Sequence, residues 1–286
     1  MSKEAQRIWL DQVDNSSIVE PNTTEDIICP VRYSRFKYGD GEVADIYGAM
    51  LAEKVLEDEI IGNGTYAVTS SGYKIAPPAS HSMLASFVDR VRQASPETII
   101  TPFKINRGVL TQGDYASMGI AEREKIMEKN GLSMPEGFDT SVDGVIALDD
   151  ILVTGSHERM LHKLFIRSGL SETPISYAYI LKVEDGCADP RVEAEINHCA
   201  IRSLSHVAQL SRETSLFVPN ARICKMVVSS DQATIEEFCS NVNDAALETI
   251  LRYIEGDELH EMDTYRSGVE AFRNAYANRK TMALTR

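Results

Sequence analysis

Cysteine is scarce in this sequence and forms no recognisable motif. Its 286 residues include five cysteines, none of them in a C-x-x-C pair: Cys29, Cys187, Cys199, Cys224 and Cys239. An odd number at irregular spacing predicts neither a disulfide framework nor a thiolate zinc site.

Long apolar runs are missing as well. No unbroken stretch approaches the ~20 apolar residues that a membrane helix requires. The first residues, MSKEAQRIWLDQV, are charged throughout and lack the apolar core of a secretory signal. We therefore expect a cytoplasmic protein with no membrane partner.

Positive charge is in short supply. The chain has 29 Lys and Arg against 43 Asp and Glu, a formal net charge of -14. Sequence-independent binding to nucleic acid needs many cations to neutralise phosphates, so we expect no nucleic-acid partner. A small anion held in a local basic pocket stays compatible with this charge.

The common glycine motifs for nucleotides are absent or misplaced. The sequence has no P-loop, and Gly39–Ala44 fits G-x-G-x-x-A without the apolar strand that should precede it. That preceding segment carries Arg32, Arg35 and Lys37 instead. These three residues form a local basic cluster, and we expect it to be a solvated surface. The alternative is that Arg35 and Lys37 hold a phosphate or an acidic acceptor.

Apolar periodicity predicts an α/β fold with a mostly parallel sheet flanked by helices and an added helical C-terminal part. The segment 144–148 (GVIAL) is continuously apolar, as in a parallel strand covered on both faces. The other strands are expected at 65–69, 97–103 and 175–183. Helices are expected at 42–57, before the first of these strands, and at 79–94, 120–130 and 157–168.

We divide the chain into an N-terminal arm and helix (1–59), an α/β core (60–186) and a mainly helical C-terminal region (187–286). The last region has helical patterns at 191–211, 232–255 and 263–277 and a candidate strand near 222–228. An apolar stripe there suits a helical core or a homodimer contact. It comprises Ile235, Phe238, Val242, Leu247, Leu251 and Ile254.

Two adjacent carboxylates, Asp149 and Asp150, follow the strand at 144–148, and Thr154-Gly155-Ser156 then opens a helix. Ligands of open α/β sheets bind beyond the carboxyl ends of the strands. Sugar hydroxyls and Mg²⁺ suit the carboxylates, and the N–H groups of a helix start suit a phosphate. This order predicts a ribose 5-phosphate site. A solvated turn, with Asp150 or Thr154 as an N-cap, is the alternative.

The segment closely resembles the motif with which type I phosphoribosyltransferases bind phosphoribosyl pyrophosphate (PRPP). The resemblance implies that Asp149 and Asp150 contact the ribose hydroxyls and Mg²⁺, and that residues 153–157 hold the 5′-phosphate. Those five residues are Val153, Thr154, Gly155, Ser156 and His157. Val153 and His157 depart from the family, which more often has a hydroxyl residue and a threonine there.

The T-G-S-H-E ending resembles a divergent subgroup of these proteins encoded in bacterial tellurite-resistance and stress gene clusters. The segments 33–40 (YSRFKYGD) and 220–225 (NARICK) fit that subgroup too, so the resemblance spans about 31–276.

Two further loops have counterparts in the type I family. The segment Ser70-Ser71-Gly72-Tyr73-Lys74 lies where the family's pyrophosphate loop follows the first core strand, although an ordinary strand-to-helix turn explains it equally well. The polar stretch 104–121 is the candidate lid, and its Lys104 and Arg107 are candidate catalytic cations.

The resemblance implies a magnesium-dependent transferase that moves ribose 5-phosphate from PRPP to a small acceptor, with a nitrogen heterocycle as the expected class. Two alternatives stay open: a PRPP- or nucleotide-sensing regulator without transfer activity, and an enzyme of nucleotide phosphorolysis or hydrolysis. Fold alone does not decide between them.

Overall fold

The structure, a computed structural model, describes residues 5–13, 27–108, 131–184 and 190–284. The candidate lid beyond residue 108 and the helix expected at 120–130 lie outside these residues. Within the described ranges, no helix is both long and apolar enough to cross a membrane.

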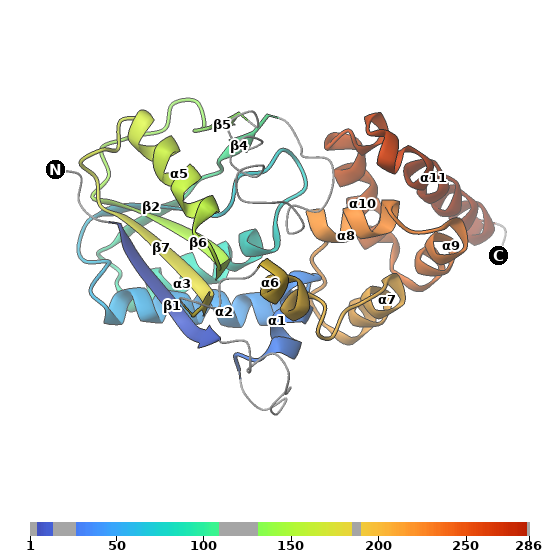
Figure 1. The fold of residues 1–286 in the computed structure, drawn as a ribbon, viewed down its shortest axis with the longest axis horizontal. Coiled ribbons are helices and arrows are strands. Elements are labelled where there is room, and N and C mark those ends of the chain that lie inside the picture. The colour runs from blue at the N-terminus through green and yellow to red at the C-terminus, as the bar shows by residue number, and fades with distance from the viewer. Residues whose placement is uncertain (1–4, 14–26, 109–130, 185–189, 285–286) are drawn as a thin grey trace.

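A five-stranded parallel sheet forms the centre of the α/β part, with strand order β1-β7-β6-β2-β3 (Figure 1). The strands are β1 (Gln6–Val13), β2 (Thr65–Thr69), β3 (Ile99–Pro102), β6 (Gly144–Leu152) and β7 (Ile175–Val183). The predicted fold class, a mostly parallel sheet flanked by helices, is confirmed.

Helices cover both faces of this sheet (Figure 1). On β6, Ile146 and Leu148 pack into the core with α2 (Gly41–Glu57) and α3 (Leu84–Ala94), which follows the 3-10 helix η1 (Ala79–Met83). Val145 and Ala147 point to the opposite face, where α5 (Ser156–Arg167) covers them. The unbroken apolar run therefore reflects burial on both faces.

Strand β1 corrects the expectation of an irregular N-terminal arm. It pairs in parallel with β7, from Gln6 opposite Ser176 to Val13 opposite Val183. Its Ile8 and Val13 are buried, whereas most of its other side chains are partly or fully exposed. Strand β1 lies at an edge of the sheet, next to β7. The division of the chain at residues 59 and 186 stays a prediction.

The acidic pair lies inside β6 rather than after it. We expected a strand over 144–148, but β6 continues to Leu152 because the nine-residue β7 still pairs with it at Asp149, Ile151 and Leu152. On its other side, β2 ends at Thr69, opposite Ala147. The sheet therefore steps at the acidic pair, which opens one side of β6 to a ligand.

The C-terminal region is a cluster of helices beside the sheet (Figure 1). The segment 191–211, predicted as one helical stretch, forms two helices, α6 (Pro190–Asn197) and α7 (Leu204–Glu213). The segment 232–255 likewise forms α9 (Gln232–Asn241) and α10 (Asp244–Gly256). Ser203 and Asn243 cap α7 and α10, which explains the breaks. The short helix η3 (Leu259–Glu261) and α11 (Asp263–Leu284) follow. The apolar stripe is core: five members are buried and Leu251 is partly buried.

The strand predicted near 222–228 is wrong, because this segment forms the helix α8 (Ala221–Val228). The side chain of Asn220 accepts hydrogen bonds from the backbone N–H groups of Arg222 and Ile223, at 3.0 and 3.2 Å. Apolar side chains at helical spacing then face the core: Ile223, Cys224, Val227 and Val228. The cap and this spacing outweigh the strand preference of the β-branched residues.

A close helix crossing fixes α8. A Cβ atom on Gly268 of α11 would lie 1.9 Å from the carbonyl oxygen of Val228, so only glycine fits there. We expect Gly268→Ala to lower the free energy of unfolding by about 1–3 kcal/mol, because the added methyl forces the two helices apart. Urea denaturation measures this loss. Ser267→Ala, at the exposed neighbouring position, is the control, and equal stability of the two variants would contradict the account.

Candidate functional site

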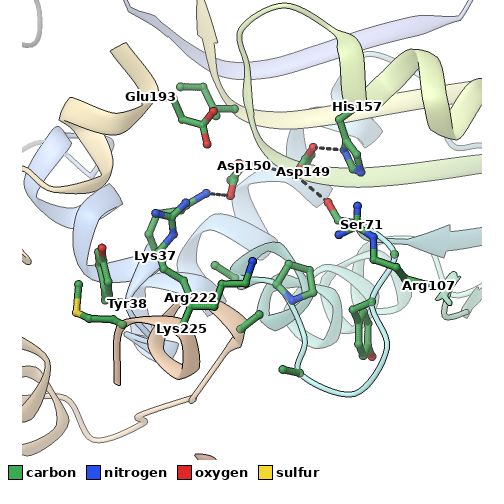
Figure 2. Close-up of a pocket in the computed structure, with 18 of the residues that line it drawn as sticks. Lys37, Tyr38, Ser71, Arg107, Asp149, Asp150, His157, Glu193, Arg222 and Lys225 are labelled. Carbon is green, nitrogen blue, oxygen red and sulfur yellow. Dashed lines mark hydrogen bonds and ion pairs between the residues drawn. The ribbon is translucent and has the colours of Figure 1, made fainter. Parts of the chain in front are cut away.

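A pocket of about 730 Å³ opens at the step in the sheet. Its walls come from β6 and the start of α5, from the end of helix α1 (Pro30–Lys37), from the loop after β2, and from α6, α8 and α11. The acidic pair lies in its interior, with Lys37 and Arg222 on one side and Ser71 and His157 on the other (Figure 2).

Asp149 is held from several directions. Its Oδ2 lies 2.8 Å from His157 Nδ1, and its Oδ1 accepts from Ser71 Oγ at 3.3 Å and from the Asp150 backbone N–H at 3.0 Å. Burial by itself would raise the pKa of Asp149, but the charge and hydrogen bond of His157, with smaller contributions from the Asp150 N–H and Lys37, lower it overall. Asp149 is therefore an anion at neutral pH.

Asp150 forms an ion pair with Lys37, whose Nζ donates to Asp150 Oδ2 (Figure 2). Lys37 is the last residue of α1 and is only 5% exposed. Its ammonium also lies over the ring of Tyr33, 5.7 Å from the centroid, and its carbonyl accepts from Asn220 Nδ2 at 3.1 Å. The interpretation of Lys37 as a solvated surface residue is therefore wrong.

The segment 153–157 turns from β6 into α5. Gly155 adopts the left-handed region with φ 67°, which glycine tolerates and side chains rarely do, and Ser156 is the first residue of the helix. The hydroxyls of Thr154 and Ser156 lie 3.0 Å apart. All five residues of the segment line the pocket, and Val153 also packs against the main core.

Two residues beside this turn were not foreseen from the sequence. Arg159 donates to the Thr154 carbonyl at 2.9 Å and to Ser156 Oγ at 3.0 Å, which places a cation beside the helix start. Glu158 is buried and accepts hydrogen bonds from Arg7 of β1, at 2.8 to 3.0 Å, and from Tyr179 at 2.9 Å. Strand β1 therefore supports the turn from behind.

The candidate pyrophosphate loop contributes three of its five residues, Ser71, Gly72 and Tyr73, to the pocket. Ser70 is buried outside the lining, and Lys74 forms an ion pair with Glu258. The short ribbon of β4 (Asn106–Arg107) and β5 (Leu132–Ser133) packs against this loop: a Cβ on Gly72 would lie 2.8 Å from Ile105 and 2.9 Å from Leu132.

Of the other cations predicted for the site, Arg107 lies in the pocket, whereas Lys104 and Arg35 lie outside its lining. Arg107 lines the pocket, while Lys104 donates to the Lys74 carbonyl at 2.6 Å and lies over the Tyr73 ring, 4.4 Å from its centroid. Arg35 pairs with Asp40 at 2.8 Å and with Glu213 at 3.0 Å, outside the pocket lining. Lys37 is therefore the member of the basic cluster that reaches the site.

The far wall adds residues that the sequence analysis did not place in the site. Tyr38, Glu193, Arg222 and Lys225 are labelled in Figure 2, and His198 also lines the pocket. The Arg222 guanidinium lies over the Tyr38 ring, 6.0 Å from the centroid. The segments 33–40 and 220–225 thus meet at the pocket. Arg222 and Lys225 are three residues apart, and this helical spacing would have placed both on one face had the segment been read as a helix.

The match to a protein family covers most of the chain. A family described as PRTase ComF-like, where PRTase stands for phosphoribosyltransferase, matches residues 28–272. No curated protein shows significant similarity to the sequence.

Solved structures give weaker likenesses. A hypoxanthine phosphoribosyltransferase from Staphylococcus aureus has 11% identity and a TM-score of 0.33, over 53% of this chain and 68% of that chain. One from Trypanosoma cruzi has 13% identity and a TM-score of 0.30, over 50% of this chain and 65% of that chain. Scores at this level do not establish a shared fold, so the family assignment rests on the family match.

The contact between His157 and Asp149 makes a prediction about acid stability. His157→Gln removes a charge that lowers the pKa of Asp149, so this pKa should rise. A carboxyl with a lowered pKa stabilises the fold above its unfolded-state pKa, and that contribution is lost as the pH falls through the folded pKa. The variant should therefore lose stability at a higher pH than the wild type during acidification.

Thermal unfolding across the acid range and ¹³C NMR titration of the aspartate carboxyls measure this shift. His162→Gln is the matched control, because His162 lies on the same helix and contacts Tyr177 at 3.4 Å instead. Identical acid profiles for the wild type and His157→Gln would show that His157 does not govern Asp149.

Proposed function

This chain belongs to the PRTase ComF-like family, and on that premise we propose that its pocket binds PRPP and transfers the ribose 5-phosphate to a small acceptor. The observation that carries the proposal is the joint placement of the acidic pair and the glycine turn at Gly155 in one pocket. The two groups suit the two ends of a ribose 5-phosphate.

The turn at Gly155 is the proposed 5′-phosphate site. The first N–H groups of α5, from Ser156 onward, have no carbonyl partner within the helix and carry the positive end of its dipole. The hydroxyls of Thr154 and Ser156 are further donors, and Arg159 adds a cation beside them. Such a helix start commonly binds a phosphate.

Asp149 and Asp150 are the proposed partners of the ribose hydroxyls. Ionised carboxylates accept hydrogen bonds only, and hydroxyls donate them, so the two groups are complementary. Their negative charge also lies where the ribose develops positive charge as the bond from C1 to pyrophosphate breaks. The new bond forms between C1 and an acceptor nitrogen, which releases its proton.

The pyrophosphate is proposed to lie against Ser71, Gly72 and Tyr73, with Arg107 as a cation that lines the same pocket. The acceptor would then occupy the opposite wall, near Glu193, Arg222 and Lys225. A nitrogen heterocycle stays the expected acceptor class, because ring N–H groups and carbonyls match this mixture of carboxylate and cationic side chains.

Magnesium fits this site only together with the ligand. Among the described residues, no group of three or more His, Cys, Asp or Glu side chains could hold a metal ion. Magnesium in proteins usually binds through one or two carboxylates plus substrate phosphates, and it would supply charge neutralisation for the leaving pyrophosphate. We propose that Mg²⁺ arrives as the PRPP complex, in a pocket that also contains the carboxylates of Asp149 and Asp150.

Binding without transfer is the second candidate function. Two observations favour it: both carboxylates already contact side chains of the protein, Asp149 with His157 and Asp150 with Lys37, and the apolar Val153 packs against the core within the candidate phosphate loop. A regulator that senses PRPP would need the same pocket but no base for the acceptor. Release of pyrophosphate with any acceptor would exclude this alternative.

Calorimetric titration of PRPP with Mg²⁺ tests the proposed site. We expect binding by the wild type and a loss of at least about 1.5–3 kcal/mol of binding free energy in Asp149→Asn, because a charged hydrogen-bond acceptor is removed. Asp89→Asn, at an exposed position on α3, should bind as the wild type does. A folded wild-type protein that does not bind PRPP would rule the proposal out.

A further inference from the structure

The acidic pair raises a question of charge that the proposed function leaves open. Two adjacent carboxylates in a partly buried position repel each other and lose hydration, so they need cations nearby. In this structure the side chains of Asp149 and Asp150 are only 19% and 14% exposed. A cation must therefore balance them whenever a ligand excludes water from the pocket.

The protein itself supplies side-chain partners for both carboxylates, and the partner of Asp150 is a cation. Lys37 contacts Asp150 Oδ2, and His157 contacts Asp149 Oδ2. Asp149 Oδ1 accepts from Ser71 and from a backbone N–H. Among the described residues, Asp150 Oδ1 is therefore the one carboxylate oxygen of the pair that has no side-chain or backbone hydrogen-bond donor. A single oxygen next to an ammonium is a poor site for a divalent cation, which the lysine charge repels.

Lys37 is built into this position. It is almost fully buried, its carbonyl is fixed by Asn220 at the start of α8, and its ammonium lies against the ring of the buried Tyr33. It also closes the last turn of α1, where a cation interacts favourably with the helix dipole. A lysine on a mobile surface segment would have none of these restraints.

The remaining chemistry of Lys37 suits a sugar phosphate. An ammonium has three N–H donors, and one of them is used on Asp150. The others can donate to a ribose hydroxyl or to a phosphate oxygen of a ligand at the acidic pair. Asp150 Oδ1 can at the same time accept from a ribose hydroxyl, so lysine and carboxylate together bind the sugar from both sides.

We propose that the Lys37 ammonium takes the place of a divalent cation at Asp150, so that the ribose end of the ligand binds without a metal ion. This inference rests on the proposed function. It assigns Lys37 as a ligand-binding residue and restricts Mg²⁺ to the pyrophosphate end of PRPP.

Ribose 5-phosphate is the probe that isolates this end, because it lacks the pyrophosphate that binds Mg²⁺ in PRPP. Its affinity is measured calorimetrically with EDTA and with saturating Mg²⁺, for the wild type and for Lys37→Met. The wild-type dissociation constants in the two conditions should agree within about threefold, since no metal site forms at the ribose. Lys37→Met should bind at least about tenfold more weakly in EDTA, because a charged donor is lost.

Two further variants complete the experiment. Lys37→Arg keeps the charge and should keep metal-independent binding, and Lys54→Met removes a surface lysine that pairs with Asp58 and should change nothing. Circular dichroism verifies that each variant is folded. If Lys37→Met does not fold, the wild type and Lys37→Arg still decide the matter through their metal dependence.

The outcomes separate the two claims. The role of Lys37 is overturned if the wild type loses ribose 5-phosphate binding in EDTA, or if Lys37→Met binds it as tightly as the wild type does in EDTA. In either case, wild-type binding of PRPP with Mg²⁺ would leave the proposed function intact. Failure of the wild type to bind either ligand in the presence of Mg²⁺ removes the proposed function and this inference together.

Discussion

A largely buried ion pair between Lys37 and Asp150 joins the parts of this protein that form its pocket. Asp150 belongs to the central strand β6, and Lys37 is the last residue of helix α1. The backbone carbonyl of Lys37 in turn accepts a hydrogen bond from the side chain of Asn220, the residue that caps α8. One lysine therefore connects the sheet to the C-terminal helices. Breaking such a pair leaves an uncompensated buried charge, which is strongly unfavourable. The position of the far wall depends on it.

The other constraint on the site is the unequal length of neighbouring strands. Strand β7 continues beside β6 through the acidic pair, while β2 ends earlier at Thr69. The residues of β6 at this step, from Asp149 to Leu152, line the pocket. The loop after β2, the turn at Gly155 and helix α8 converge on it. A parallel sheet thus provides a binding crevice at the carboxyl ends of its strands, as general rules for such sheets lead one to expect.

The sequence predicted those features that depend on residues close together in the chain. The run at 144–148 identified a doubly covered strand, and the carboxylates with Thr154-Gly155-Ser156 identified the turn into α5. Long-range contacts could not be read in this way. Strand β1 pairs with β7 at the other end of the α/β part, and Lys37 meets a residue 113 positions away. In 222–228, β-branched residues suggested a strand, but the cap by Asn220 and the packing of one face produce a helix.

The pairing of Lys37 with Asp150 is the central claim, and a double-mutant cycle on unfolding tests it most directly. Urea unfolding of the wild type, Lys37→Met, Asp150→Asn and the double variant gives the coupling free energy between the two side chains. A largely buried pair predicts favourable coupling of about 1–3 kcal/mol, with the double variant more stable than the sum of the single losses implies. Purely additive losses would show that the two side chains do not interact, and would contradict the account of how the pocket is held together.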